Sequence, residues 1–570
     1  MSAEVSRREL LAAVAAVGVG GAAFQRAAVA AAAQPKVEAV TPEMVQSAEW
    51  VAGITLTEPE RKAVAAALTN TLRTVAALNK LPISNAVGPA VHFTAVPGEP
   101  PSKGGRGTVE LNRKPEGVNK LDGDDLAFAP LADLAEQVRH KLVSSTELTK
   151  LYLARLKKYD PALLCVVSLT EEVALKQAAE ADKEIAAGKY RGPLHGIPWA
   201  AKDLIAYPGH PTTWGAGHFK EQTFEERATV AARLDAAGAV LACKTTLGAL
   251  AWGDVWFGGT TRNPWNIKQG SSGSSAGTAS AVAAGLVGFG LGSETHGSIV
   301  SPSTRCGVTG LRPTFGRVSR HGCMALCWSL DKVGPMCRSA EDCALVLGAI
   351  HGFDGKDPTA QDRPFDWPAK ADLKELRVGF VEGRSGGLSD DDRKALAGLG
   401  VKLVPITLPA GPAGALMSMI LDVESAAAFD DITREGVKEN IGLWPNTFRR
   451  GRFVSAVDYL RAQRARTRLM REMTQVFEKV DLYANGNDLA LTNLTGHPTV
   501  CLPNGFTKAG TPTALTFTGK LFGEGALLTV AKAYQDATGH HRKRPPQDAW
   551  VPEKKGDTKD ESAGTVHPLR

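Results

Sequence analysis

The chain has 570 residues, of which 43% are hydrophobic and 22% are charged. Its 59 glycines and 33 prolines are too few for a collagen-like or low-complexity protein, and eight cysteines are too few for a disulfide scaffold. The 66 basic residues exceed the 60 acidic residues by only six, so charge alone indicates neither a nucleic-acid nor a membrane partner. Length and composition therefore predict a globular protein with a large apolar core and more than one domain.

The first part of the chain reads as a twin-arginine export signal. Arg7 and Arg8 precede an uncharged stretch at 10–24, which is shorter than the roughly 20 residues that a membrane-spanning helix needs. Small-residue triplets follow at 28–30 and 31–33, as is typical before a signal-peptide cleavage site. We therefore expect the mature protein to be soluble and either periplasmic or secreted. An uncleaved anchoring helix is the alternative.

Two short regions are expected between this signal, residues 1–33, and the main domain. Residues 34–95 are predicted to form a helical extension with two helices, the second beginning at a capping box in which Thr57 and Glu60 can each bond the other's backbone N–H. Residues 96–125 are rich in proline, glycine and charge without a sustained period, which is typical of an exposed linker.

Residues 126–545 are predicted to form one large α/β domain, followed by a polar tail at 546–570. Helical spacing over 126–158 is interrupted by a second helix start, Ser144-Ser145-Thr146-Glu147, and a further helix at 171–187 ends at Gly188. Short apolar runs then alternate with helical segments: the runs are 238–242, 279–291, 344–350, 376–380 and 401–406, and later helices are expected at 460–480 and 526–537. Strands alternating with helices predict a sheet covered by helices.

Two serine- and glycine-rich segments that bracket an apolar segment give the strongest chemical signal. They are QGSSGSSAG at 269–277 and SETHGS at 293–298. Upstream, Lys202 stands at the end of the apolar run GIPWAA. Burial lowers the pKa of a lysine toward that of a neutral amine, which can act as a base.

Several motifs together resemble the amidase signature family over most of residues 126–545. They are LHGIPWAAKDL, GSSGSSAGTASAVAAG, GSETHGSIVSPS, GVTGLRPTFGRVSRHG, SLDKVGPM and TGHPTVCLPNGF, in the family's order. The resemblance implies an α/β fold with a large twisted mixed β-sheet and helices on both faces. It also implies an amidase that hydrolyses the C–N bond of a carboxylic amide to a carboxylate and an amine or ammonia, without a metal or organic cofactor.

The resemblance further implies a catalytic triad of Ser298, Ser274 and Lys202. Ser274 is preferred to Ser271 because the family places its bridging serine 24 residues before the nucleophile and enters it through a cis peptide bond, here Gly273–Ser274. In the family the nucleophile attacks the amide carbonyl while the bridging serine passes a proton to the neutral lysine. The lysine later returns a proton to the leaving amine, and water hydrolyses the acyl-enzyme.

The resemblance places an oxyanion hole at the backbone N–H groups of Thr295, His296, Gly297 and Ser298. Several amides point to one position only in a tight turn, which favours glycine at 297. His296 departs from the glycine or aspartate that relatives often carry. Since only its backbone N–H is used, catalysis should survive, while the side chain narrows or polarises the acyl pocket.

Two other motifs compete with this interpretation. Gly273–Gly277 also fits G-x-S-x-G, the nucleophile elbow of α/β-hydrolases, with Ser275 as nucleophile, which would suit a serine esterase. An elbow follows a buried apolar strand, whereas 260–270 is polar and contains Pro264. Gly238–Thr245 is one substitution from a phosphate-binding loop, but without the second glycine a strand end leading into a turn is favoured.

The remaining candidate residues have ordinary structural explanations. The cysteines at 323, 327, 337 and 343 lack zinc-site spacing, so buried free thiols are expected. No histidine is needed where lysine is the base, so structural or pocket-lining roles are expected for those at 195, 296 and 321. The basic run at 540–544 is expected to be solvated rather than to bind a polyanion.

Two further functional classes compete with an amidase. The family includes the A subunit of the glutamyl-tRNA amidotransferase, which works with partner subunits on a tRNA-bound carboxyl, but an export signal argues against that role. A catalytically inactive binding protein is disfavoured because the three triad residues are intact.

We expect a small-molecule amide as the partner, no nucleic acid and no stable membrane span, with a homodimer left open. The pocket is expected near Trp214, Trp252, Trp256, His296 and residues 417–429.

Overall fold

The computed structural model describes residues 39–52, short pieces between 56 and 69, and residues 105–111, 118–381, 387–437, 439–451, 454–486 and 488–550. The chain divides into two compact units, residues 1–87 with 452–458, and residues 88–451 with 459–570. In the first unit, α3 (Pro42–Ala52) confirms the first helix expected in the extension. The second expected helix is described only in pieces, and the export signal lies outside the described residues.

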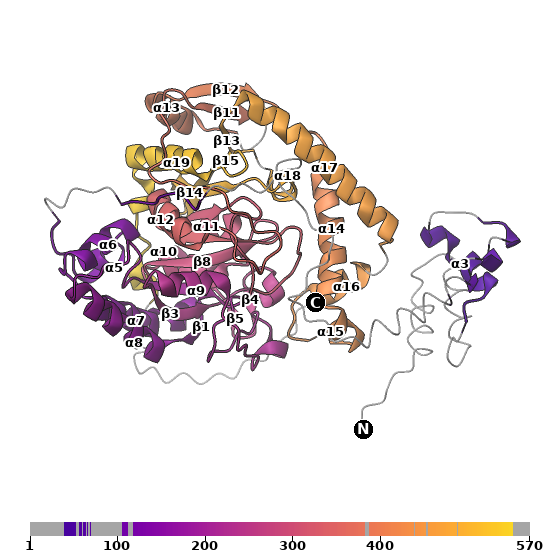
Figure 1. Cartoon of the computed structure of the whole chain (residues 1–570), viewed down its shortest axis with the longest axis horizontal. Coiled ribbons are helices and arrows are strands. Elements are labelled where there is room, and N and C mark those ends of the chain that lie inside the picture. The colour runs from indigo at the N-terminus through magenta and orange to yellow at the C-terminus, as the bar shows by residue number, and fades with distance from the viewer. Residues whose placement is uncertain are drawn as a thin grey trace, which may run out of the picture. The chain divides into compact units, whose positions relative to one another are not determined.

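A mixed sheet of eleven strands forms the centre of the second unit as described (Figure 1). In spatial order the strands are β1 (Val166–Leu169), β3 (Val240–Thr245), β2 (Pro198–Lys202), β8 (Phe289–Glu294), β10 (Lys332–Cys337), β9 (Thr309–Arg312), β14 (Thr499–Phe506), β15 (Pro512–Gly519), β13 (Leu482–Ala484), β11 (Arg377–Val381) and β12 (Lys402–Ile406). β2 is parallel to β3 and β8, and β11 is parallel to β12 and β13; the other neighbours are antiparallel.

Helices flank this sheet, which confirms the expected fold class (Figure 1). They are α5 (Gly123–Ala127), α6 (Leu131–Arg139), α7 (Ser145–Leu163), α8 (Glu171–Ala186), α9 (Thr229–Ala236), α10 (Ala276–Ala283), α11 (Val300–Cys306), α12 (Ala340–Ile350), α13 (Asp390–Gly398), α14 (Ala413–Ala428), α15 (Asp430–Arg434), α16 (Trp444–Gly451), α17 (Ala456–Lys479), α18 (Leu489–Thr495) and α19 (Glu524–Thr538). Two small sheets pair β4 (Val255–Trp256) with β5 (Gly259–Thr260) and β6 (Arg262–Asn263) with β7 (Asn266–Gly270).

Local signals in the sequence set several helix ends. α7 begins at the expected capping box: Glu147 N donates to Ser144 Oγ at 3.1 Å, and Ser144 N donates to Glu147 Oε2 at 2.8 Å. α8 ends two residues before Gly188, whose φ of 81° lies in the left-handed region. The expected runs at 238–242, 376–380 and 401–406 fall on β3, β11 and β12, whereas 344–350 lies within α12.

The small-residue run after the first serine-rich segment divides into α10 and β8. Every residue of α10 is buried, and a Cβ added to Gly290 of β8 would lie 2.5 Å from Thr278 of α10. A Cβ on Gly292 would lie 2.7 Å from Ser275 Oγ. Because these positions lack larger side chains, α10 packs closely on β8, which brings the serine-rich loop before α10 to the end of that strand.

The C-terminal part of the described chain packs against the domain. Residues 547–550, which were expected to belong to a polar tail, form a short 3₁₀ helix. Trp550 is fully buried, and its indole N–H donates to Pro264 O at 2.8 Å. Its ring lies edge-to-face on Tyr159, with 5.2 Å between the centroids. One aromatic side chain thus anchors a segment that also contains the polar residues Gln547 and Asp548.

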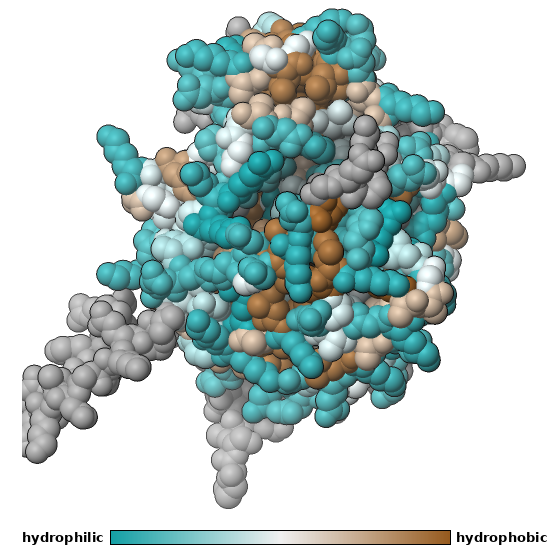
Figure 2. All heavy atoms as spheres, turned by 90° about the vertical axis from the view of Figure 1, so that its left-hand side faces the viewer, coloured by the Kyte–Doolittle hydropathy of each residue, from teal (hydrophilic) through white to brown (hydrophobic). Residues whose placement is uncertain are grey.

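Two ion pairs lie among the residues that line one cavity of the second unit. This cavity of about 480 Å³ is lined by residues that include Arg544, whose guanidinium lies 2.9 Å from Asp125, and Lys532, which lies 2.7 Å from Asp536. Figure 2 shows the face on the left-hand side of Figure 1, where hydrophilic residues surround a central hydrophobic area.

Among the described residues, no helix combines the length and apolarity that crossing a membrane would require.

Candidate active site

Lys202, at the end of β2, lies buried among hydroxyl groups. Its Nζ is 2.7 Å from Ser274 Oγ, 2.9 Å from Ser293 Oγ and 3.1 Å from Ser275 Oγ, and it donates to Ser293 O at 3.3 Å. Burial lowers the pKa of Lys202 to about 7, although the carboxylates of Asp331 and Glu294 act in the opposite direction. Near neutral pH a large fraction of this amine is therefore uncharged and able to accept a proton.

The loop that carries Ser274 is fixed by tight contacts on its other side. The Gly273–Ser274 peptide bond is cis, as the resemblance implied. Ser272 N donates to Asp254 Oδ2 at 2.8 Å, and a Cβ added to Gly273 would lie only 1.9 Å from Gly253 O. The segment Gly253-Asp254 therefore packs directly on the serine loop, and glycine at 273 is required for this close approach.

Ser298 lies in the turn between β8 and α11, next to the same loop. Ser275 N donates to Ser298 O at 3.1 Å, which places the backbone of Ser298 beside the Ser274 loop. Gly297 has a φ of 115°. Within the described part of the chain, the backbone N–H groups of His296, Gly297 and Ser298 donate no hydrogen bond, so they remain available to a ligand oxygen.

Glu294 fixes the end of this turn that leads into α11. The sequence did not predict this role. Its Oε2 accepts hydrogen bonds from Ile299 N and Val300 N, both at 2.9 Å. Its Oε1 lies 2.7 Å from Arg312 Nη1 and accepts from Asn493 Nδ2 at 2.8 Å. Burial alone would raise the pKa of Glu294, but the nearby cations and N–H donors lower it to about 2. Glu294 is therefore an ionised anchor for the first turn of α11.

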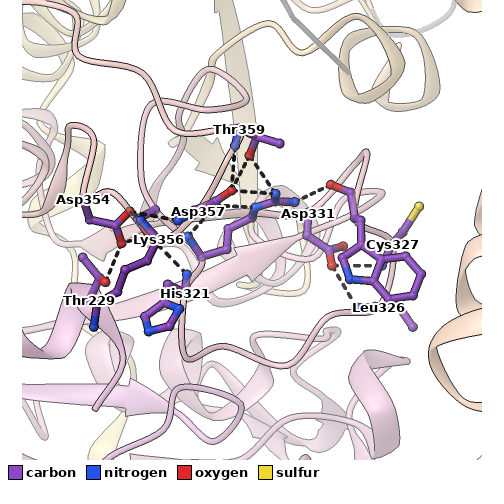
Figure 3. Close-up of polar contacts among 12 residues, drawn as sticks. Thr229, His321, Leu326, Cys327, Asp331, Asp354, Lys356, Asp357 and Thr359 are labelled. Atoms are coloured by element: carbon purple, nitrogen blue, oxygen red, sulfur yellow. Dashed lines mark hydrogen bonds and ion pairs between the residues drawn. The ribbon is translucent and has the colours of Figure 1, made fainter. Parts of the chain in front are cut away.

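Asp331 holds the start of the same turn. Thr295 Oγ1 donates to Asp331 Oδ1 at 2.7 Å, while Asp331 Oδ2 accepts from Leu326 N at 2.8 Å and Cys327 N at 2.9 Å. Figure 3 shows Asp331 with these two residues, next to a second cluster centred on Asp357. The signals that could have found Glu294 and Asp331 lie in the quoted motifs GSETHGS and SLDKVGPM.

The second cluster braces the loop that leads to Asp331. Arg320 donates to Asp357 through its backbone N and its Nε, both at 2.9 Å, and through Nη2 to Thr359 Oγ1 at 2.7 Å. Arg320 also donates to the Trp328 carbonyl. Although burial opposes it, Arg320 lowers the pKa of Asp357 well below its usual range. The loop from 319 to 331 is thus tied to 357–359 at one end (Figure 3). At the other end Asp331 ties it to the turn at Thr295.

The alternative serines occupy different positions. Ser271 Oγ donates to the carbonyl of Ser272 at 2.9 Å and is not among the partners of Lys202. Ser275 Oγ touches Lys202 but also donates to Ser293 O at 3.1 Å. The strand before the serine loop, β7, pairs with β6 outside the central sheet. A nucleophile elbow needs a central strand there, so the geometry does not fit that alternative.

The other candidate motifs have structural roles. In the segment that resembles a phosphate-binding loop, Lys244 lies on β3 and is buried 2.7 Å from Asp203, which favours the strand interpretation. His195 and His321 lie 3.2 Å and 2.6 Å from glutamates, whereas the His296 side chain is exposed. The four clustered cysteines are free thiols.

Comparisons with known proteins agree with this geometry. A family model described as Amidase matches residues 147–485. The putative amidase AmiD of Mycobacterium tuberculosis is 34% identical over 75% of this chain and 98% of its own length. The A subunit of the glutamyl-tRNA(Gln) amidotransferase of Thermosynechococcus vestitus is 33% identical over 73% of this chain and 99% of its own length. The structure of native peptide amidase from Stenotrophomonas maltophilia is 30% identical, with a TM-score of 0.65, over 72% of this chain and 97% of its own.

Proposed function

The chain belongs to the amidase family and hydrolyses the C–N bond of a carboxylic amide, and we propose that Ser298, Ser274 and Lys202 carry out this reaction. The observation that carries the proposal is the buried Lys202 amine, 2.7 Å from Ser274 Oγ and with a pKa lowered to about 7. The backbone contact from Ser275 N to Ser298 O supports Ser298 as the third member of the group.

In the first half of the proposed reaction, Ser298 forms an ester with the acyl group. Ser298 Oγ attacks the amide carbonyl carbon, its proton passes to Ser274 Oγ, and the Ser274 proton passes to the neutral Lys202 Nζ. The negative charge that develops on the carbonyl oxygen is stabilised by the N–H groups of residues 295–298. The C–N bond then breaks as Ser274 donates a proton to the leaving amine and regains one from Lys202.

In the second half, water replaces the amine. It attacks the Ser298 ester and loses a proton to Lys202 along the same route. The bond between Ser298 Oγ and the acyl carbon then breaks as Lys202 returns that proton through Ser274 to Ser298 Oγ, and the released carboxylic acid ionises to the carboxylate. An arrangement of donors that is already fixed before the reaction stabilises the transition state without reorganisation. Glu294 and Asp331 support this role because they anchor the two ends of the turn.

The proposal is tested with purified protein on a panel of amides. We expect Ser298→Ala to lower kcat/KM by at least about 10³-fold, and Lys202→Ala to lower kcat/KM by nearly as much. Ser271→Ala is the matched control, because Ser271 is a buried serine of the same loop that does not contact Lys202. Circular dichroism checks that each variant is folded. Substantial activity in folded Ser298→Ala or Lys202→Ala would contradict the assignment.

A second candidate role is that of an amidotransferase A subunit, favoured by the 33% identity to the Thermosynechococcus vestitus protein over nearly its whole length. Glutamine belongs in the panel for this reason. If glutamine is the only amide of the panel from which the protein releases ammonia, and if this release depends on Ser298, the result supports the amidotransferase role. Turnover of other amides without a partner protein would support a free-standing amidase.

We also propose that the protein is exported by the twin-arginine route to the periplasm or beyond. The proposal rests on Arg7, Arg8 and the uncharged stretch that follows them. A fusion of residues 1–33 to a reporter should be exported, and Arg7→Lys with Arg8→Lys should retain the reporter in the cytoplasm. Retention of the unaltered fusion would contradict it.

A further inference from the structure

We propose that an exposed hydrophobic surface beside the serine loop binds an aryl or long alkyl group of the amide substrate. This surface, the hydrophobic platform, consists of Trp252, Val255, Phe257 and Leu443. The inference rests on the proposed function, since it assigns the substrate class of the same site.

The platform continues directly into the proposed active site. Trp252 is followed by Gly253 and Asp254, the two residues that contact the serine loop. Asp254 Oδ2 accepts a hydrogen bond from Ser272 N at 2.8 Å, and a Cβ on Gly273 would lie 1.9 Å from Gly253 O. Trp252 therefore directly precedes, in the chain, the backbone that packs against the peptide bond entering Ser274.

The side chains of the platform are unusually exposed for their type. Trp252 is 43% exposed, Val255 59%, Phe257 42% and Leu443 70%. In the described part of the second unit, two other large hydrophobic side chains, Phe353 and Leu460, are comparably exposed, so four of the six belong to the segment 252–257 and to Leu443, which precedes the Trp444 that packs on Trp252. Contiguous exposed apolar surface is uncommon on soluble proteins and typically marks a binding site.

Buried aromatic rings hold the platform in place. Trp252 lies edge-to-face on Trp444 at 4.9 Å between centroids, and Trp444 is buried with its indole N–H donating to Ala249 O at 3.0 Å. Trp444 in turn stacks on Phe448 at 5.2 Å. These contacts join the segment before β4 to α16. A fixed apolar surface loses little conformational entropy when a ligand binds.

Phe257 is joined to the same assembly from the other side. Its backbone N donates to Gly215 O at 3.3 Å, and Trp256 packs edge-to-face on its ring at 4.7 Å. Gly215 follows Trp214, whose ring contacts Phe429, and Phe429 stacks on Phe448. The β4–β5 hairpin is thus connected to α16 through the backbone hydrogen bond from Phe257 to Gly215 and the ring contacts of Trp214, Phe429 and Phe448. A flat, rigid apolar surface of this kind suits an aryl ring or an extended alkyl chain.

The expected effect is a dependence of kcat/KM on the size of the apolar group. Full burial of one methylene corresponds to about fourfold in affinity. The platform covers one side of a chain, so we expect about twofold per added methylene. From a methyl to a hexyl substituent, kcat/KM should therefore increase by roughly 30-fold.

The test uses two series of amides, one with the acyl chain lengthened and one with the amine substituent lengthened. The wild-type protein should show the increase in one series, and that series identifies which side of the amide lies on the platform. In the double variant Val255→Ser with Phe257→Ser, the hexyl-to-methyl ratio of kcat/KM should fall at least fivefold. Phe353→Ser, which removes an exposed aromatic ring elsewhere, 51% exposed against 42% for Phe257, should keep the wild-type ratio.

The outcomes separate this inference from the proposed function. If wild-type protein hydrolyses no amide, the proposed function fails. If it hydrolyses amides with no dependence on chain length, or if the platform variant keeps the wild-type ratio, the inference alone is wrong. Leu443→Ser, at a residue 70% exposed on another part of the platform, repeats the test if the double variant does not fold.

Discussion

The pH dependence of amide hydrolysis follows from the environment of Lys202. Burial lowers the pKa of this amine to about 7, and the proposed reaction uses its neutral form as the base. At pH 5 only about 1% of an amine with this pKa is neutral, against about half at pH 7 and nearly all at pH 9. We therefore expect kcat/KM to increase about 50-fold from pH 5 to pH 7 and only about twofold from pH 7 to pH 9.

The assay measures kcat/KM from pH 5 to pH 9.5 at constant ionic strength, with an amide substrate that does not ionise in this range. Circular dichroism at each pH shows whether the protein stays folded. Ser293→Ala identifies the titrating group, because Ser293 Oγ lies 2.9 Å from Lys202 Nζ and stabilises the charged amine. Removing this hydrogen bond should lower the midpoint of the profile further.

A midpoint near 10, the ordinary pKa range of lysine, would refute this reasoning, and so would a rate that is constant between pH 6 and pH 8 in folded protein. A midpoint of about 7 that does not move in Ser293→Ala would mean that another group titrates.

Three substitutions test the packing around the site. Gly273→Ala would place a methyl group 1.9 Å from Gly253 O, so the serine loop must shift, and we expect kcat/KM to fall about 10²-fold; wild-type kcat/KM would contradict this. Glu294→Gln leaves Arg312 buried without its counter-charge, so we expect the free energy of unfolding, measured by urea titration, to fall by about 3–5 kcal/mol. A loss below about 1 kcal/mol would argue against Glu294 as an anchor of the turn. Trp550→Ala should cost about 3–5 kcal/mol in the same assay, and unchanged stability would show that the segment at 547–550 is not part of the core.

Local chemistry made part of the fold and site predictable. The capping box at Ser144 and Glu147 depends on residues three apart, so it is readable from the sequence and is present in the structure. Lys202 follows an apolar run, which predicted its burial. The choice of Ser274 over Ser271 came from the family's spacing, which the resemblance implied, and Ser274 is the one of the two that contacts Lys202.

The contacts that hold the site could not be predicted in the same way, because they join segments that only the folded chain brings together. Glu294 pairs with Arg312 across the sheet, and Asp254 bonds Ser272 from a different loop. Neither pair has a spacing that a helix or a hairpin would dictate. The burial of Trp550 is similar: no apolar run around it predicts a buried segment, and the surface around Tyr159 explains its position.

Covalent trapping of the nucleophile tests the central claim most directly. Wild-type protein treated with a fluorophosphonate should lose activity and gain one adduct, which peptide mass spectrometry should locate on Ser298, and Ser298→Ala should gain none. An adduct on Ser275 instead, or loss of activity with Ser298 unmodified, would contradict the assignment of Ser298 as the nucleophile.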